Sequence, residues 1–150
     1  MEQFLKNSRA FIAEVKSQNA VWLREAGESA ISLVDRRITE SGRTAGGTQL
    51  GDYTDGVYKK KRQDKGLTTS YVNLAFTNDM WSDVGIINVV TGANIARLTI
   101  GASFQENKNK LVYNSVRYND DILEVSQSEE DKLAKIMDVN LQLTANKYFK

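Results

Sequence analysis

Five cations gather in the middle of the chain, at Lys59, Lys60, Lys61, Arg62 and Lys65. Basic runs of this kind neutralise phosphates, and the tyrosines on either side, Tyr58 and Tyr71, have ring faces on which bases stack. Runs of charge are also common on solvated surfaces that bind nothing. The run therefore indicates either a nucleic-acid contact or a solvated basic face, and both interpretations remain open.

Two stretches nearby resemble ligand-binding loops only in part. The glycines of residues 46–51 have the spacing of a phosphate-binding loop, but Asp52 and Tyr53 follow where that chemistry needs Lys and then Ser or Thr. The stretch DYTDG, at 52–56, is similar to the start of a calcium loop. Its ligand spacing is wrong, however, and Gln63 stands where the closing Glu would fall. We therefore predict neither a phosphate loop nor a calcium site.

An acid–acid–lysine pattern of the kind used by some magnesium nucleases can be drawn through Asp83, Glu106 and Lys108. That chemistry needs the Glu and Lys on a strand beside an apolar core, whereas here they lie in the polar run QENKNK, which is typical of an exposed helix start. The chain also has no His and no Cys, the residues that supply most general bases, thiolate nucleophiles and zinc ligands. We therefore predict a protein that is not an enzyme and has no metal or cofactor site.

A second charged block, the acidic segment of residues 119–131, has the opposite sign. It contains six acids and no base, at Asp120, Asp121, Glu124, Glu129, Glu130 and Asp131. The acids at 129–131 fall in the first turn of a predicted helix, where the helix dipole favours negative charge. By contrast, residues 58–70 have five cations and one acid, although the net charge of the whole chain is only +1. The two blocks can meet within one molecule or between copies of it, and the sequence leaves both open.

The overall composition is that of a globular chain. Its 150 residues are 41% hydrophobic and 26% charged, which is enough for one domain, residues 1–150, with a buried core. Glu2, Lys6 and Arg9 interrupt the only early apolar cluster, so we expect no secretory signal. No apolar run is long enough to predict a membrane span, and we expect no membrane contact.

Hydrophobic periodicity predicts an α+β fold that begins with a long helical region. Residues 3–39 have apolar residues at helical spacing in two stripes divided near 17–19, which predicts one helix or a helix pair. Gly27, inside the second stripe, indicates a close packing contact. Five glycines between 40 and 56 predict that residues 41–70 form a long extended loop that projects from the domain.

The second half of the chain has strand signals followed by helix signals. The alternation of Val72, Leu74 and Phe76 predicts a half-buried strand, and 84–90 and 95–100 predict an antiparallel hairpin with its loop at 91–94. A short helix is predicted at 103–118, with a buried face made by Phe104, Leu111, Val112 and Val116. A brief extended piece at 122–125 then precedes a capping box at Ser126 and Glu129, which begins a last helix to about Ala145. The predicted core packs three helix residues on five sheet residues: Leu23, Ala30 and Val34 on Val72, Leu74, Phe76, Ile86 and Leu98.

The stretch LGDYTDGVYKKKRQDKGLTTSYVNLAFTNDMWSDVGI, residues 50–86, resembles a pattern in head–tail connector and tail-completion proteins of tailed bacteriophages. In that family a turn with Gly and Tyr leads through a basic stretch into an apolar strand that stops in a turn. The matching residues are Gly51, Tyr53, Thr54, Tyr58, Arg62, Gly66, Leu67, Thr69, Val72, Leu74, Phe76, Thr77 and Met80. Asn78 stands where Gly is usual, a tolerable change because Asn also enters left-handed conformations. A looser likeness continues at 114–131, so that the resemblance covers most of residues 20–140.

The resemblance implies a structural virion protein, without enzymatic activity, that forms a ring at the joint between the capsid portal and the tail. It would act as a head–tail connector, tail-completion or tail-terminator protein, made in the cytoplasm of a bacterial host. Its implied partners are further copies of the chain and the neck and tail proteins on the portal-adaptor and tail-tube sides, with non-specific contact to the DNA that passes through the ring. We expect the subunit interface to contain Tyr58, Lys59, Lys60, Lys61, Arg62, Lys65, Asp120, Asp121 and Glu124. The alternative is a small nucleic-acid-binding protein that uses Lys59–Arg62 on DNA.

Overall fold

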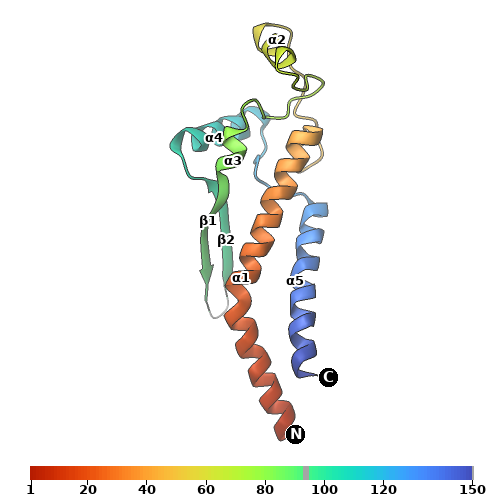
Figure 1. Cartoon of the computed structure of the whole chain (residues 1–150), viewed down its shortest axis with the longest axis vertical. Helices are drawn as coiled ribbons and strands as arrows, with labels where there is room; N and C mark the ends of the chain where they lie inside the picture. The colour runs from red at the N-terminus through yellow and green to blue at the C-terminus, as the bar shows by residue number, and fades with distance from the viewer. Residues whose placement is uncertain (93–94, 150) are drawn as a thin grey trace.

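The computed structural model describes residues 1–92 and 95–149 and shows an elongated α+β molecule (Figure 1). The elements in chain order are α1 (Glu2–Ser41), α2 (Val57–Asp64), α3 (Asp79–Asp83), β1 (Val84–Thr91), β2 (Ala96–Ala102), α4 (Gln105–Tyr118) and α5 (Gln127–Tyr148). Figure 1 shows α1 in the middle, with the β1–β2 hairpin along one side and α5 along the other. The predicted α+β class is therefore confirmed.

Helix α1 is one continuous helix of 40 residues and not a helix pair. At the usual rise per residue its length is about 60 Å, so it defines the long axis of the molecule. The helix ends at Gly42, whose φ of 62° lies in the left-handed region and whose N–H donates to the Ile38 carbonyl at 2.9 Å. A side chain at Gly42 would also collide with the ring of Tyr71, since a Cβ atom there would lie 2.5 Å from Tyr71 Cδ2. Glycine at this position therefore both ends the helix and lets the following chain turn back against it.

Helix α5 runs antiparallel to α1, and the two chain ends lie side by side in Figure 1. Aromatic rings join these ends, with Phe149 5.9 Å from Phe4 and 5.6 Å from Phe11 between ring centroids. At the other end of α5 the predicted capping box is present, and the Glu129 carboxylate accepts the Ser126 N–H at 2.7 Å. The ring contacts hold the C-terminal end of α5 against α1, and at the other end Glu129 also pairs with Arg37 of α1.

The predicted hairpin is present as an antiparallel pair in which Val84 lies opposite Ala102 and Thr91 opposite Ala96. Of its predicted loop, residues 93–94 lie outside the described part of the chain. The hairpin packs on α1 where that helix has no side chain, since a Cβ atom at Gly27 would lie 2.6 Å from Leu98 Cδ1 and 3.1 Å from Ile86 Cδ1. The predicted close contact at Gly27 is therefore confirmed, and its partner is the hairpin.

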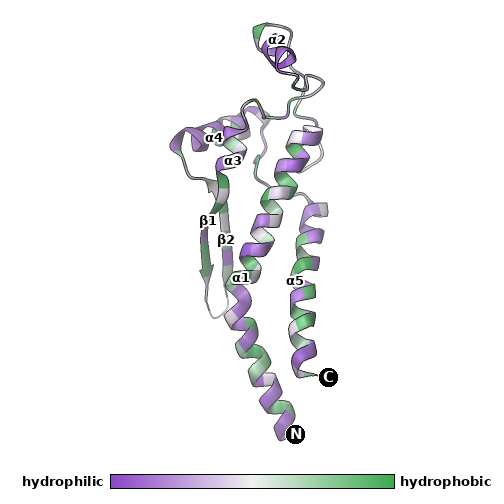
Figure 2. Ribbon diagram, in the orientation of Figure 1, coloured by the Kyte–Doolittle hydropathy of each residue, from purple (hydrophilic) through white to green (hydrophobic). Residues whose placement is uncertain are grey.

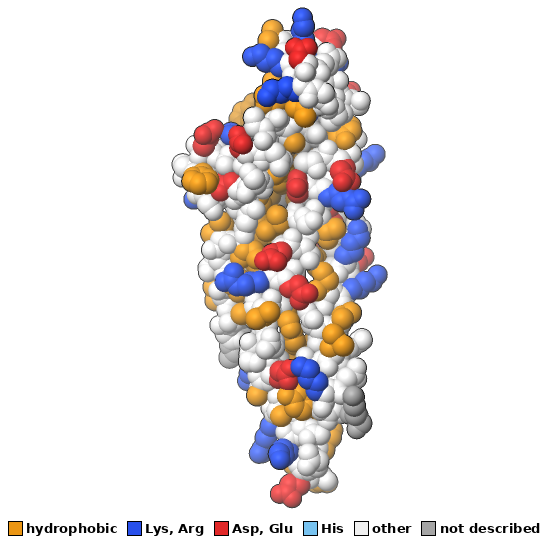
Figure 3. Space-filling model, viewed as in Figure 1, with side chains coloured by type: hydrophobic (Ala, Val, Ile, Leu, Met, Phe, Trp, Pro, Cys, Tyr) orange, Lys and Arg blue, Asp and Glu red, His pale blue; other side chains and the backbone are white. Residues whose placement is uncertain are grey.

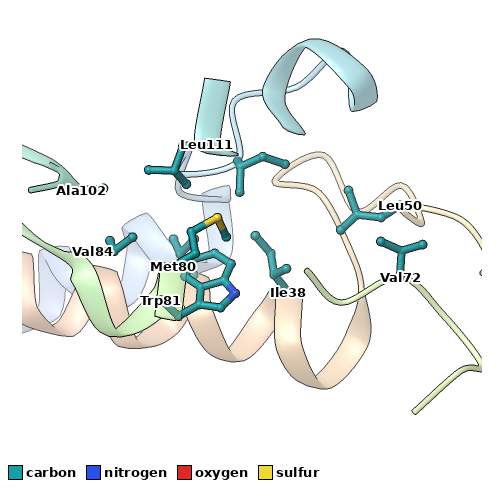
Figure 4. Packing of buried hydrophobic residues seen from close by; sticks show 10 residues of the cluster. Ile38, Leu50, Val72, Met80, Trp81, Val84, Ala102 and Leu111 are labelled. Atoms are coloured by element: carbon teal, nitrogen blue, oxygen red, sulfur yellow. The ribbon is translucent and has the colours of Figure 1, made fainter. Parts of the chain in front are cut away.

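The buried core lies where the second half of α1 meets α3, α4 and the base of the hairpin (Figure 4). Its members are Val34, Ile38, Leu50, Val72, Met80, Trp81, Val84, Ala102, Leu111 and Ile122. Of the predicted core, Ala30, Val34 and Val72 are buried. The other predicted members, Leu23, Leu74, Phe76, Ile86 and Leu98, are only half-buried.

Three local predictions are wrong. Residues 72–76 and 122–125 form no strand, and 57–64, predicted as loop, is the helix α2. The short helix predicted at 103–118 is confirmed as α4, but only Leu111 of its predicted buried face is buried. The other three side chains, Phe104, Val112 and Val116, are 71%, 64% and 77% exposed.

Candidate subunit interface: the arm and the acidic segment

The basic run lies on a projecting arm, which we define as residues 51–76. Figure 1 places its helix α2 at one end of the molecule, beyond the C-terminal end of α1. Figure 2 shows α2 as largely hydrophilic, so this short helix is not held in place by burying an apolar face of its own. Its attachment has another cause.

That cause is Arg62, whose side chain is completely buried, with 0% exposure. Its Nε donates to the Thr68 carbonyl at 2.9 Å, and its Nη1 donates to the Ala75 carbonyl at 2.7 Å. The remaining nitrogen, Nη2, donates to Asn73 Oδ1 at 2.9 Å. The guanidinium carbon also lies 4.3 Å from the centre of the Tyr53 ring, a cation–π contact. One buried cation therefore ties α2 to both flanks of the arm.

The same contacts explain why residues 72–76 form no strand. Asn73 Oδ1 accepts the Ala75 N–H at 3.3 Å, a local turn, and Leu74 between them has a φ of 52°. Left-handed backbone at a Leu is strained and interrupts an extended run. Because the Ala75 carbonyl bonds to Arg62 and not to a neighbouring strand, the alternating apolar pattern does not lead to a sheet.

The burial of Arg62 corrects its predicted place in the interface, since a side chain in the interior of one chain is not available to a neighbour. Burial also raises the pKa of Tyr53, which therefore remains a neutral phenol against the guanidinium. The Tyr53 hydroxyl donates to Asn73 Oδ1 at 3.2 Å, completing the polar interior of the arm.

The lysines of the arm remain on its surface, and Figure 3 shows cations at this end of the molecule. Lys59 pairs with Asp55 at 2.9 Å, and Lys65 Nζ lies 4.7 Å from the centre of the Phe76 ring. Lys60 and Lys61 are exposed, and neither forms an ion pair with any residue that the structure describes. Val57, one helical turn before them, is 74% exposed. The outer face of α2 therefore combines one apolar side chain with two unpaired cations.

The acidic segment connects α4 to α5 and differs in its burial from residue to residue. Glu129 is buried and pairs with Arg37 of α1 at 3.0 Å, so its charge is compensated within the chain. Asp120 Oδ1 is buried, and no hydrogen-bond partner for it lies among the described residues. Asp121, Glu124, Glu130 and Asp131 are exposed, and the Asp121 carboxylate accepts the N–H of Leu123 at 3.0 Å. Of these four acids, Asp121 and Glu124 lie in the connection that precedes α5.

Two hollows meet at these two acids. One is an acidic hollow of about 590 Å³ beside the loop at 45–46, where Asp120 and Glu130 also line the wall. The other is an apolar groove of about 550 Å³ between α1, β2 and the start of α5. Its apolar lining consists of Leu23, Ala26, Gly27, Ala30, Leu98, Ile100, Leu123, Val125 and Leu133. Asp121 and Glu124 line both hollows and so form the boundary between them.

The structure does not bring the two charged blocks together within one chain. No ion pair or hydrogen bond links a lysine of the arm to residues 119–131 in the part of the chain that the structure describes. The sequence pattern does not predict the groove, because the spacing of Leu23, Ala30 and Leu98 places them in the core. The polar partners of Arg62 were missed as well, although an Asn in the middle of an apolar alternation was an available signal of a turn.

Comparisons of the chain with protein-family models, with curated proteins and with solved structures found no match. Within residues 1–92 and 95–149, no group of three or more His, Cys, Asp or Glu side chains is placed to hold a metal ion. Over the same residues, no helix combines the length and the apolar character that crossing a bilayer requires.

Proposed function

We propose that the protein is a structural component of a phage neck, a ring of identical chains that joins the portal and capsid to the tail as a connector, tail-completion or tail-terminator protein. The observation that carries the proposal is the separation of charge: a projecting arm has unpaired lysines, an exposed acidic segment lies elsewhere, and the two do not meet in one chain. Surfaces of opposite sign at different places on one molecule favour head-to-tail contacts, which form a ring when the rotation between neighbours closes. The sequence resemblance over residues 50–86 supports a location of that ring at the joint between the capsid portal and the tail.

The burial of Arg62 weakens the alternative of a DNA-binding arm. With Arg62 inside and Lys59 paired to Asp55, the cations free to meet phosphates are Lys60, Lys61 and Lys65. Three phosphate contacts correspond to a slope of about −2.7 in a plot of log affinity against log salt concentration, well below that of proteins whose main task is to hold duplex DNA.

The molar mass of the purified protein, measured by light scattering alone and with duplex DNA across a salt series, tests the proposal. A neck component forms a closed oligomer, visible as rings by electron microscopy, and retains it when DNA is absent. A protein that remains monomeric at every concentration and binds duplex DNA with a steep salt dependence would instead be a nucleic-acid-binding protein.

A further inference from the structure

We propose that the outer face of α2 from one chain docks at the boundary between the apolar groove and the acidic hollow of the next chain. The inference rests on the proposed function, because it identifies the contact by which copies of this chain join into a ring. Its occupant is the α2 helix of a second copy, with Val57 in the groove and Lys60 and Lys61 against Asp121 and Glu124.

The first step of the argument is that both surfaces lack a partner in their own chain. Val57 is 74% exposed, and Lys60 and Lys61 project into solvent from the arm. The groove has an almost entirely apolar lining from α1, β2 and α5 and is open at the surface. Figure 3 shows hydrophobic side chains reaching the surface among acidic and basic ones along the middle of the molecule.

The second step is that the two surfaces have complementary chemistry. On α2, Lys60 and Lys61 follow Val57 by three and four positions, so the three side chains share one helical face. At the groove, two exposed carboxylates, Asp121 and Glu124, stand directly beside an apolar floor that includes Leu23 and Leu133. A helix seated there buries its apolar residue next to apolar walls while each lysine meets a carboxylate.

The third step concerns the acids behind this boundary. Asp120 and Glu130 extend the negative surface into the acidic hollow, and Asp120 Oδ1 is buried with no hydrogen-bond partner among the described residues. A hollow whose wall contains several carboxylates favours an approaching cation. The hollow therefore attracts the lysines of α2 and rejects an acidic helix, which makes the contact directional.

The fourth step is symmetry. A contact in which each chain inserts its arm into the groove of the next is heterologous, and it leaves a pair of chains with one unused arm and one unused groove. Such a contact continues from chain to chain and forms a ring where the rotation between neighbours closes. An isologous contact, by contrast, would stop at a dimer.

Because the parent chain has no cysteine, a disulfide can form only between the cysteines that are introduced. The test variant combines Lys61→Cys with Glu124→Cys, and the matched control combines Lys61→Cys with Asp138→Cys, an exposed acid on α5 that does not line the groove. Both are oxidised, and a bismaleimide cross-linker covers pairs that are too far apart for a disulfide. We expect a ladder of covalent species larger than a dimer for the test variant and none for the control.

A second pair of variants tests the charges without a cross-link. Lys60→Glu with Lys61→Glu is expected to weaken self-association by about 2- to 30-fold, the range for two exposed ion pairs, and Asp121→Lys with Glu124→Lys in the same chain should restore part of it. If oligomers form but the test variant gives no ladder and the reversal no rescue, the docking site is wrong and the ring proposal remains. If the parent chain never self-associates, both proposals fail.

Discussion

Arg62 Nη2 donates to Asn73 Oδ1 at 2.9 Å, and this bond joins the last turn of α2 to a segment eleven residues further along the chain. The same Asn73 oxygen accepts from the Tyr53 hydroxyl and from the Ala75 N–H. Three parts of the arm therefore meet at one amide oxygen beside a buried cation. In the interior of the arm, hydrogen bonds to a charge replace most of the apolar packing that holds an ordinary helix in place.

Replacing that cation should release the arm while the rest of the fold remains. Arg62→Lys keeps the charge but cannot reach three acceptors in a fixed plane, so we expect the free energy of local opening to fall by about 2–5 kcal/mol. Hydrogen exchange of the amides in α2, or tryptic cleavage after Lys59–Lys61, measures this opening. The two Trp residues lie outside the arm, and buried Trp81 should keep its fluorescence.

Lys60→Ala is the matched control, because Lys60 is an exposed cation on the same helix. It should leave the opening of the arm unchanged within about 0.5 kcal/mol. Equal protection of α2 in the Arg62→Lys and Lys60→Ala proteins would show that the Arg62 contacts do not hold the arm.

The arm also shows how far the sequence can predict this fold. Long periodic segments were predictable, because α1, the β1–β2 hairpin, α4 and the capped α5 each have a local pattern that tertiary contacts reinforce. The strand at 72–76 was predicted from the same kind of pattern and is wrong. The Ala75 carbonyl accepts from the side chain of Arg62, 13 positions earlier, and a contact between residues so far apart leaves no trace in the hydrophobic periodicity.

The candidate interface was predictable in its charges but not in its geometry. Lys60 and Lys61 and the acids Asp121 and Glu124 are exposed, as a surface contact requires. The sequence does not distinguish these from Arg62 and Glu129, charged residues of the same two blocks that are buried. Burial depends on how the segments fold over one another, and the groove exists only because α1, β2 and α5 meet there.

The buried pair of Arg37 and Glu129 should anchor α5 to α1. The carboxylate accepts from Arg37 Nε at 3.0 Å, and Arg37 also donates to the carbonyls of Arg43 and Glu124. Glu129→Ala leaves the guanidinium without its counter-charge and removes the capping box, so the free energy of unfolding should fall by about 3–5 kcal/mol. Urea denaturation followed by circular dichroism measures the change.

The control for this variant is an ion pair of the same kind on the surface. Arg36 and Glu40 pair at 2.8 Å with both side chains well exposed. Glu40→Ala should therefore cost only about 0–1 kcal/mol. A loss for Glu129→Ala as small as that for Glu40→Ala would mean that the buried pair does not stabilise the helix contact.

Asp35 should contribute to the stability of the folded protein in acid but not at neutral pH. Burial raises the pKa of this carboxyl group, and the charge of Glu40 raises it further. The folded chain then holds the proton to a higher pH than the unfolded chain does, so the contribution of Asp35 to stability is fully present below the unfolded pKa. It is lost as the pH rises through the folded value. Asp35→Asn should melt at a higher temperature than the parent at neutral pH, and this advantage should disappear in acid.

The contribution of Glu14 to stability should depend on pH in the opposite direction. Hydrogen bonds from Lys147 and Tyr148, both at 2.5 Å, lower the pKa of its carboxyl group. Its contribution is present above the unfolded pKa and is lost as the pH falls through the folded value. Glu14→Gln should therefore melt at a lower temperature than the parent at neutral pH, with the difference shrinking in acid. Differences in melting temperature from the parent that shift in the same direction with pH for Asp35→Asn and Glu14→Gln would contradict one of the two assignments.

Gly27→Ala tests the contact between α1 and the hairpin. Alanine in the middle of a helix is favoured over glycine by about 1 kcal/mol. At this position, however, the added Cβ would lie 2.6 Å from Leu98 Cδ1 and 3.1 Å from Ile86 Cδ1, so these two side chains must shift, and overpacking of this kind costs about 1–3 kcal/mol. We expect the variant to be less stable than the parent by up to about 2 kcal/mol, measured by thermal or urea denaturation.

Leu98→Ala shows whether the collision causes that loss. Shortening Leu98 removes the atoms nearest to the new Cβ, so adding Gly27→Ala to the Leu98→Ala protein should raise its stability by up to about 1 kcal/mol, the propensity gain alone. The same substitution at Gly27 then has opposite signs in the two backgrounds, which only direct contact between the two sites explains. If Gly27→Ala stabilises the parent as well, α1 and the hairpin do not pack as closely as this structure shows.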